Sequence, residues 1–205
     1  KGGYLNYLQK HLETLKEIKD VEITNLGITG QRSDQLLKRL KLEEVQKSIQ
    51  ESDMVFITIG GNDLMKIVKN NFTNLQVDVF EDELDNYQNR LNSILSEVKN
   101  VNPSATVVLL GVYNPFSDMF GDIDEFQLIV NEWNDASLKI VNQYENTIFV
   151  NISKIFAETD SNLLYEDHFH PNNKGYKLIA KEVFKTLKEY RNSEEKDREE
   201  EVAHE

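Results

Sequence analysis

Two short motifs, far apart in the sequence, combine residue types that suit acyl-transfer chemistry. The first is Gly-Gly-Asn-Asp at residues 60–63, and it places the amide of Asn62 on a glycine turn directly after the apolar run 54–59. An amide in that place can donate hydrogen bonds to an oxyanion that develops during the reaction. The second motif places Asp167 three residues before His170, so that one carboxylate can orient one imidazole as a general base. A base, its orienting acid and an oxyanion donor are three of the four parts that acyl transfer needs.

Both motifs also have plainer interpretations. Residues 60–63 could form an ordinary turn in which Asp63 caps a helix, and we interpret Asp63 as such a structural cap rather than as a catalytic acid. Asp167 and His170 could bind a metal ion together with His168 between them. One carboxylate and two imidazoles so close in sequence rarely converge without a further ligand, however. We therefore expect no metal ion there, and we interpret the two motifs as parts of one catalytic site.

The composition restricts the class of protein. A chain of 205 residues with 39% apolar residues can bury one sizeable core, and this length favours a single domain. The net charge is −13 and Lys and Arg form no dense group, which argues against a nucleic-acid or anionic-membrane partner. The absence of cysteine excludes disulfides and thiolate–zinc sites. The acidic, Lys- and Asn-rich composition is compatible with a bacterial protein that is exported to the cell envelope or secreted.

Apolar residues recur along the chain with a period that switches between helical and strand-like spacing. Helical spacing is found at residues 5–15, 33–52, 81–99, 124–144 and 172–190. Strand-like apolar runs lie at residues 21–25, 54–59, 106–110 and 147–152. Strands that are apolar on both faces and alternate with helices predict a mostly parallel sheet that is covered on both sides.

We therefore expect an α/β fold, a three-layer α/β/α sandwich formed by residues 1–190. The acidic segment 191–205 has almost nothing to bury, and it should form either a solvated extension of the last helix or a disordered tail. Ligands of such sheets bind at the carboxyl ends of the strands. Tyr113 and Phe116 follow the third expected strand, and there they could line a site for an apolar acyl chain. They could equally pack their own loop against the sheet.

Taken together, these blocks resemble the SGNH or GDSL hydrolases, and among them the small bacterial lipase or acylhydrolase branch. The resemblance covers roughly residues 2–190 and implies a flavodoxin-like sheet and a covalent acyl-enzyme formed without metal or cofactor. It implies that the backbone N–H of Gly30, in Asn-Leu-Gly-Ile-Thr-Gly, and the side chain of Asn62 form the oxyanion hole. It makes His170 the base and Asp167 its orienting partner. Without the resemblance, Gly30 could serve turn geometry alone.

The first block of this family, a strand that ends in Gly-Asp-Ser-Leu and supplies the nucleophile, has no counterpart in the sequence. In the flavodoxin-like strand order it would lie between the strands expected at residues 21–25 and 54–59. Because unpaired buried strand edges are costly, we expect the intact polypeptide to carry the nucleophilic serine in an N-terminal segment of roughly 30 residues or more. Ser33 is better explained as a helix N-cap, and Ser161 lies in a loop without a glycine elbow, so neither is expected to be the nucleophile.

Two functions of different classes remain. The first is a serine ester hydrolase that acts on a small-molecule, lipid-like ester. The second is a non-catalytic flavodoxin-like module, or a degenerate hydrolase relative, that binds a lipid or a glycan. The presence of Gly30, Asn62, Asp167 and His170 favours the hydrolase, because a module freed from catalysis has no physical need for all four.

Overall fold

The computed structural model describes residues 3–71, 78–116, 124–159 and 162–203 of the 205-residue chain. Its described residues contain one parallel sheet in which the strands follow the order β1-β2-β3. The strands are β1 (Met54–Thr58), β2 (Thr106–Leu110) and β3 (Thr147–Val150). Ile57 pairs with Leu109, and Leu109 pairs with Phe149, so the carboxyl ends of all three strands lie along the same edge.

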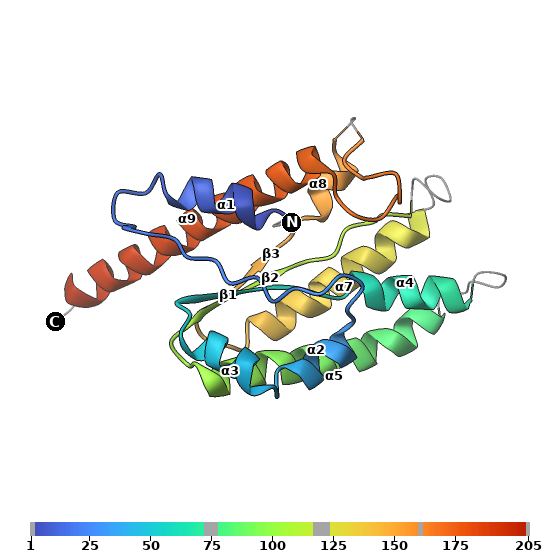
Figure 1. The fold of residues 1–205 in the computed structure, drawn as a ribbon, viewed down its shortest axis with the longest axis horizontal. Helices are drawn as coiled ribbons and strands as arrows, with labels where there is room; N and C mark the ends of the chain where they lie inside the picture. The colour runs from blue at the N-terminus through green and yellow to red at the C-terminus, as the bar shows by residue number, and fades with distance from the viewer. Residues whose placement is uncertain (1–2, 72–77, 117–123, 160–161, 204–205) are drawn as a thin grey trace.

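Helices cover both faces of this sheet (Figure 1). One layer consists of α1 (Leu5–Leu12), α8 (Ser153–Ala157) and α9 (Asn173–Ala203). The other consists of α2 (Ser33–Arg39), α3 (Glu43–Gln50), α4 (Gly61–Asn70), α5 (Asp78–Val101) and α7 (Asp124–Val141). Within the described part of the chain, no helix combines the length and the apolar character needed to cross a bilayer. The predicted three-layer α/β class is confirmed.

The strand sequences explain this layering. Side chains alternate between the two faces of a strand; Val107 and Leu109 of β2 enter the core below α5 and α7, while Val108 and Leu110 enter the core below α1 and α9. All four are at most 1% exposed. A central strand that is buried on both faces needs the continuous apolar run found at residues 106–110.

Most of the predicted elements are present with small shifts of boundary. The strand at residues 106–110 matches β2 residue for residue, whereas the helix expected at 81–99 begins earlier and ends later as α5. The helical region expected at 33–52 divides into α2 and α3. Beyond Tyr190, α9 continues through Ala203, so residues 191–203 of the acidic segment prolong the last helix.

The strand expected at residues 21–25 is wrong. The segment has no strand pairing, and its carbonyl at Val21 instead accepts a hydrogen bond from Nε2 of Gln9, at 3.1 Å. Its β-branched residues favour extended backbone, but a strand also needs a neighbour whose ladder it can complete. The segment does not pair with β1, which among the described residues is paired with β2 alone.

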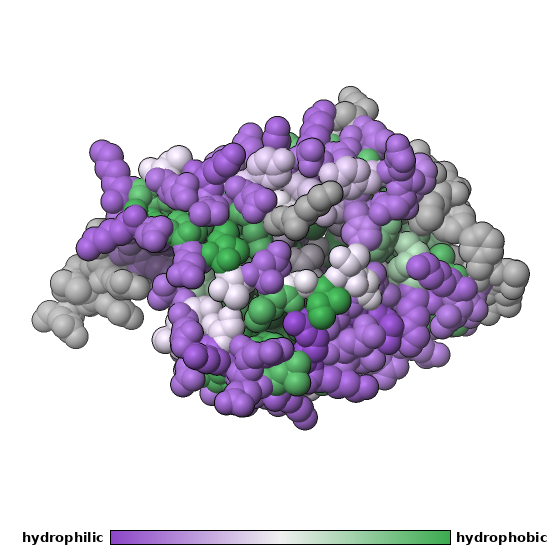
Figure 2. Space-filling view, viewed as in Figure 1, coloured by the Kyte–Doolittle hydropathy of each residue, from purple (hydrophilic) through white to green (hydrophobic). Residues whose placement is uncertain are grey.

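The outer edge of β1 is therefore open in the part of the chain that the structure describes. Val55 and Phe56 are only partly buried, whereas their partners in β2, Val107 and Val108, are fully buried. Figure 2 shows apolar side chains that interrupt the polar surface at the level where Figure 1 shows the sheet. An open, apolar strand edge is a template for pairing with a further strand.

The loops after β1 and β2 are fixed by contacts with α5 and α7. Gly60 follows β1 with a φ of 104°, and a Cβ at this position would lie 3.1 Å from the Tyr87 hydroxyl oxygen. After β2, the side chain of Asn134 accepts a hydrogen bond from the Val112 N–H at 2.8 Å and donates one to the Val112 carbonyl at 2.9 Å. These buried contacts hold the loop starts rigidly at the carboxyl edge of the sheet.

Candidate active site

Asp167 and His170 form a close pair in the loop before α9. Nδ1 of His170 lies 2.7 Å from Oδ2 of Asp167. The other carboxylate oxygen, Oδ1, accepts hydrogen bonds from the backbone N–H of Phe169 at 3.0 Å and of His170 at 2.9 Å. The carboxylate therefore fixes both the imidazole and the backbone turn that carries it. A proton on Nδ1 would leave Nε2 free to accept one, as a general base requires.

The hydrogen bonds determine the charge of Asp167. Desolvation by itself would raise the pKa of Asp167. Hydrogen bonds from the backbone and side chain of His170 and from the N–H of Phe169 outweigh it and lower this pKa to about 2. A carboxylate with a depressed pKa contributes stability above its ordinary pKa, and this contribution is lost as the pH falls toward the folded value. Asp167 therefore remains ionised through neutral and mildly acidic pH.

A pH series of unfolding midpoints tests this state. The difference in midpoint between the wild type and Asp167→Asn should be constant above about pH 5 and should shrink below about pH 4, where the unfolded carboxyl group takes up its proton. Thermal unfolding followed by circular dichroism measures both midpoints. A difference that grew on acidification would mean that Asp167 is not held as a carboxylate.

The loop that carries the pair is folded back on itself before α9 begins. Leu164 and Pro171 form an isolated antiparallel bridge, and the carbonyl of His170 accepts a hydrogen bond from the Tyr165 N–H at 2.9 Å. Asn172 donates through Nδ2 to the Leu164 carbonyl at 3.0 Å. His168 lies at the turn with a φ of 52°. Local hydrogen bonding thus defines the position of His170 before any substrate is present.

Tyr113, predicted to line the substrate site, contacts this loop. Its hydroxyl donates a hydrogen bond to the Phe169 carbonyl, and its ring stacks on Phe156 at a centroid distance of 3.9 Å. Burial, together with the nearby Tyr176 and Asp167, raises the pKa of Tyr113, so the hydroxyl remains a donor. In this structure Tyr113 holds the residue before His170, and substrate contact by its ring remains a prediction.

Tyr113→Phe should consequently lower kcat/KM of the intact protein modestly. Loss of one hydrogen bond of this kind costs about 0.5–1.5 kcal/mol, or roughly 2- to 12-fold in rate if it acts on the position of the base. Steady-state kinetics on a chromogenic ester measures the change. Tyr7→Phe is a suitable control, because Tyr7 lies in α1 and, like Tyr113, is partly buried against the core below α1 and α9.

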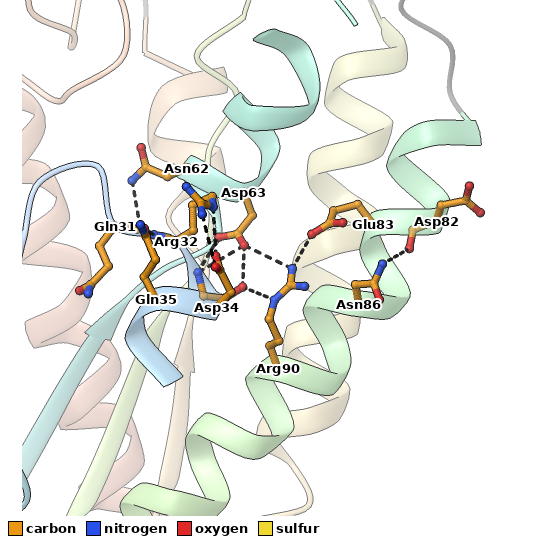
Figure 3. A network of polar contacts seen from close by, with 11 residues as sticks. Gln31, Arg32, Asp34, Gln35, Asn62, Asp63, Asp82, Glu83, Asn86 and Arg90 are labelled. Carbon is orange, nitrogen blue, oxygen red and sulfur yellow. Dashed lines mark hydrogen bonds and ion pairs between the residues drawn. The ribbon is translucent and has the colours of Figure 1, made fainter. Parts of the chain in front are cut away.

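Asn62 lies in the first turn of α4, directly after the glycines that end β1. Its Nδ2 donates a hydrogen bond to the Gln31 carbonyl at 3.2 Å, and its side chain is partly buried. An amide carries two N–H donors, so the second remains for an oxyanion. Gly30 precedes Gln31, is exposed and has a φ of 78°. The loop after residue 25 and the start of α4 are thereby brought side by side (Figure 3).

One contact joins the two predicted halves of the site. A Cβ placed on Gly61 would lie 3.7 Å from Cζ of Phe169, so the residue before Asn62 packs against the residue before His170. The ring of Phe169 also lies 5.0 Å from that of His170 in an edge-on arrangement. Gly30, Asn62, Asp167 and His170 therefore gather at one end of the sheet, beyond the carboxyl end of β1 and before the start of α9.

Phe116, the second predicted substrate-wall residue, is only 1% exposed. Its ring packs on Phe126 at a centroid distance of 4.8 Å, inside the core between the sheet and α7. This burial gives Phe116 the packing role that was the alternative interpretation.

The structure also bears on the internal serines and on the possible metal site. Ser33 is fully buried and its hydroxyl donates to Asp63 at 2.5 Å, so it is inaccessible to a substrate carbonyl. Ser161 lies outside the described residues. Among the residues that are described, no three His, Asp or Glu side chains are arranged to hold a metal ion.

Asp63 proves to have a structural role, but for another helix than its own. Its carboxylate accepts hydrogen bonds from the Ser33 N–H at 3.0 Å and from the Ser33 hydroxyl, at the first turn of α2. Burial raises the pKa of Asp63, while these bonds and the positive charge of Arg90 oppose the shift. Sequence reasoning missed Arg90, because nothing distinguishes it there from any other charged residue on an amphipathic helix.

Comparisons with known proteins agree with this arrangement. The family model described as the GDSL-like lipase/acylhydrolase family matches residues 1–178. The uncharacterized protein YpmR of Bacillus subtilis is 37% identical over 188 residues, which cover 91% of this chain and 74% of that protein. The spore germination lipase LipC of Bacillus licheniformis is 20% identical over 89% of this chain and 84% of its own length.

Solved structures show the same fold. The lipase Lip_vut3 from a goat rumen metagenome superposes with a TM-score of 0.78 at 19% identity, covering 89% of this chain and 86% of that one. An acetyl xylan esterase from Geobacillus stearothermophilus superposes with a TM-score of 0.66 at 20% identity, covering 90% and 81%. A three-layer α/β/α fold and a family match that extends over residues 1–178 lead to one conclusion: the chain belongs to the GDSL-like lipase/acylhydrolase family, whose membership supports hydrolysis of ester substrates.

Proposed function

We propose that the intact protein is a serine ester hydrolase that works through a covalent acyl-enzyme. The observation that carries the proposal is the His170–Asp167 pair, 2.7 Å apart, on a loop packed against the glycine that precedes Asn62. These contacts support the proposal, because they bring an imidazole, a carboxylate and an amide side chain together at one edge of the sheet. Acyl transfer needs all three groups, whereas a turn or a binding loop does not.

The nucleophile is assigned to a serine at the end of a strand that precedes Lys1 and pairs with the open edge of β1. Support for this assignment comes from the edge of Met54–Thr58 that faces away from β2, with which no strand pairs in the part of the chain that the structure describes. A strand in that place, parallel to β1, would end beside Gly60 and so between Asn62 and His170. Buried Ser33 offers no alternative within the described residues.

The reaction then follows in two steps. Nε2 of His170 takes the serine proton as Oγ bonds to the ester carbonyl carbon, and the resulting oxyanion is stabilised by the Asn62 amide and the Gly30 N–H. Collapse expels the alcohol, which takes the proton from His170. Water next attacks the acyl-enzyme, gives its proton to Nε2, and the acid leaves while the serine regains its hydrogen. Asp167 stabilises the imidazolium that forms in both steps.

The preferred substrate is an ester with an apolar acyl chain. Leu26 and Ile28, on the segment that leads to Gly30, are 38% and 55% exposed. Apolar side chains beside an oxyanion donor would contact the acyl portion of a bound ester. A spore germination lipase among the relatives is consistent with this class of substrate.

The intact protein should be labelled by a fluorophosphonate probe, and mass spectrometry should place the label on one serine upstream of Lys1. Prior incubation with an octanoyl ester should protect it more than an acetyl ester does. His170→Ala should abolish labelling. Labelling at Ser33 or Ser161 would contradict the assignment. No labelling and no ester turnover would favour a non-catalytic lipid- or glycan-binding module.

A further inference from the structure

Arg90 connects three helices in the layer beneath the candidate oxyanion hole (Figure 3). It projects from α5, and its Nε donates a hydrogen bond to Oγ of Ser33 at 2.6 Å. Its Nη2 lies 3.4 Å from Oδ1 of Asp63 and 2.5 Å from Oε1 of Glu83. The hydroxyl of Ser33 in turn donates to Asp63 at 2.5 Å. One guanidinium thus links the first turn of α2 to the first turn of α4.

The network is buried enough for each bond to matter. Ser33 is 0% and Asp63 2% exposed, while the Arg90 side chain is 21% exposed. A carboxylate at that depth is costly unless donors surround it. Asp63 has the N–H and the hydroxyl of Ser33 as well as Arg90. Removal of Arg90 would take away the positive charge beside the Asp63 carboxylate. It would also leave Oγ of Ser33 without the hydrogen-bond donor that Arg90 supplies.

The two ends of this network lie close in sequence to the two candidate oxyanion donors. Asp63 follows Asn62, and Ser33 lies three residues after Gly30. Gln31 lies between Gly30 and Ser33, and its carbonyl accepts a hydrogen bond from Nδ2 of Asn62 at 3.2 Å. The Ser33–Asp63–Arg90 contacts therefore set the distance between the segment that bears the backbone donor and the segment that bears the amide donor.

We propose that Arg90 is a positioning residue for the oxyanion hole: it fixes the spacing of Gly30 and Asn62 through Ser33 and Asp63, without touching the substrate. This inference rests on the proposed function. Small displacements of an oxyanion donor are expensive, because a misplacement of about 1 Å can cost roughly 100-fold in rate. The role predicts an effect on turnover that exceeds the effect on ground-state binding, since the donors act on charge that develops in the transition state.

The test uses Arg90→Met and Arg90→Lys in the intact protein, assayed well below their unfolding midpoints. Arg90→Met should lower kcat by about 10- to 100-fold with KM changed less than about 3-fold. Arg90→Lys keeps the charge but not the forked geometry, so its kcat should fall between those of wild type and Arg90→Met. Should Arg90→Met not fold, the partial loss in Arg90→Lys carries the test.

Lys99→Met is the matched control. Lys99 lies on the same helix, and its Nζ donates to the carbonyls of Ala105 at 2.8 Å and Asn146 at 3.1 Å. Both carbonyls directly precede a strand, so this cation acts at the opposite edge of the sheet from the site. Lys99→Met should lower the unfolding midpoint while leaving kcat within about 2-fold of wild type, because distant structural sites act independently.

A double-mutant cycle with Asn62→Ala separates positioning from general destabilisation. If Arg90 acts through Asn62, Arg90→Met should cost less than about 3-fold in kcat once Asn62 is gone. The side-chain amide resonance of Asn62, assigned by its loss in Asn62→Ala, should also shift in Arg90→Met. Unchanged kcat in folded Arg90→Met, or losses that multiply in the double variant, would overturn this inference and leave the proposed function standing. A wild-type protein without ester turnover would instead reject the proposed function, and the inference with it.

Discussion

Replacing His170 with alanine is expected to lower kcat of the intact protein by on the order of 10⁴-fold, the largest effect of any single change outside the nucleophile. His170 is the only candidate base with an orienting carboxylate at 2.7 Å among the residues that the structure describes around this edge. Without it the serine hydroxyl has no acceptor for its proton, and the departing alcohol has no donor. Steady-state hydrolysis of a p-nitrophenyl ester measures the loss.

The neighbouring imidazole supplies the control. His168 is exposed, lies two residues away and adopts a φ of 52°, a conformation that Asn tolerates better than Ala. His168→Asn should therefore retain folding and keep kcat within about 3-fold of wild type, as expected of a surface substitution. The assignment of the base would have to be reversed if His168→Asn lost the activity and His170→Ala kept it.

Asn62→Ala is expected to lower kcat by about 10²- to 10³-fold, the usual cost of one oxyanion donor, with KM changed little. The reason is that the amide binds the tetrahedral oxyanion more strongly than the ground-state ester carbonyl. Because the side chain is only partly buried and makes one hydrogen bond, to Gln31, the variant should fold. Circular dichroism and the same ester assay check both statements.

Asn71→Ala controls for the loss of an asparagine from the same helix. Asn71 follows the last turn of α4, where its Nδ2 donates to the Ile67 carbonyl at 2.9 Å. It therefore makes a side chain–backbone bond like that of Asn62, but at the other end of α4. Equal losses of kcat in the two variants would point to a general effect on α4 instead of to an oxyanion donor.

The sequence predicted the elements whose signal is local. Residues 106–110 are apolar without interruption, as a central parallel strand must be, and they form β2 with the predicted bounds. The spacing of Asp167 and His170 likewise requires only a turn, and the loop provides it. These features depend on neighbours in sequence, so their residue types carry the information.

The features that the sequence did not predict depend on distant partners. Residues 21–25 have the composition of a strand but no ladder to join. Arg90 meets Ser33 from 57 positions away, and nothing about an arginine in an amphipathic helix identifies that partner. Phe116 follows a strand as a substrate-wall residue would, yet the space beneath α7 buries it. Propensity describes each segment alone, and packing decides which segments meet.

The edge of β1 that is open among the described residues also has a consequence for where a serine on a further strand would lie. A strand that pairs there takes its position from the hydrogen-bond ladder: a slip of one residue turns every side chain to the opposite helical layer, and a slip of two moves it by roughly 7 Å. A hydroxyl must approach an imidazole to about 3 Å to give up its proton. The hydrogen-bond register along Met54–Thr58 would thus set the position of the serine hydroxyl. The same few backbone bonds would then be needed both for correct strand pairing and for catalysis.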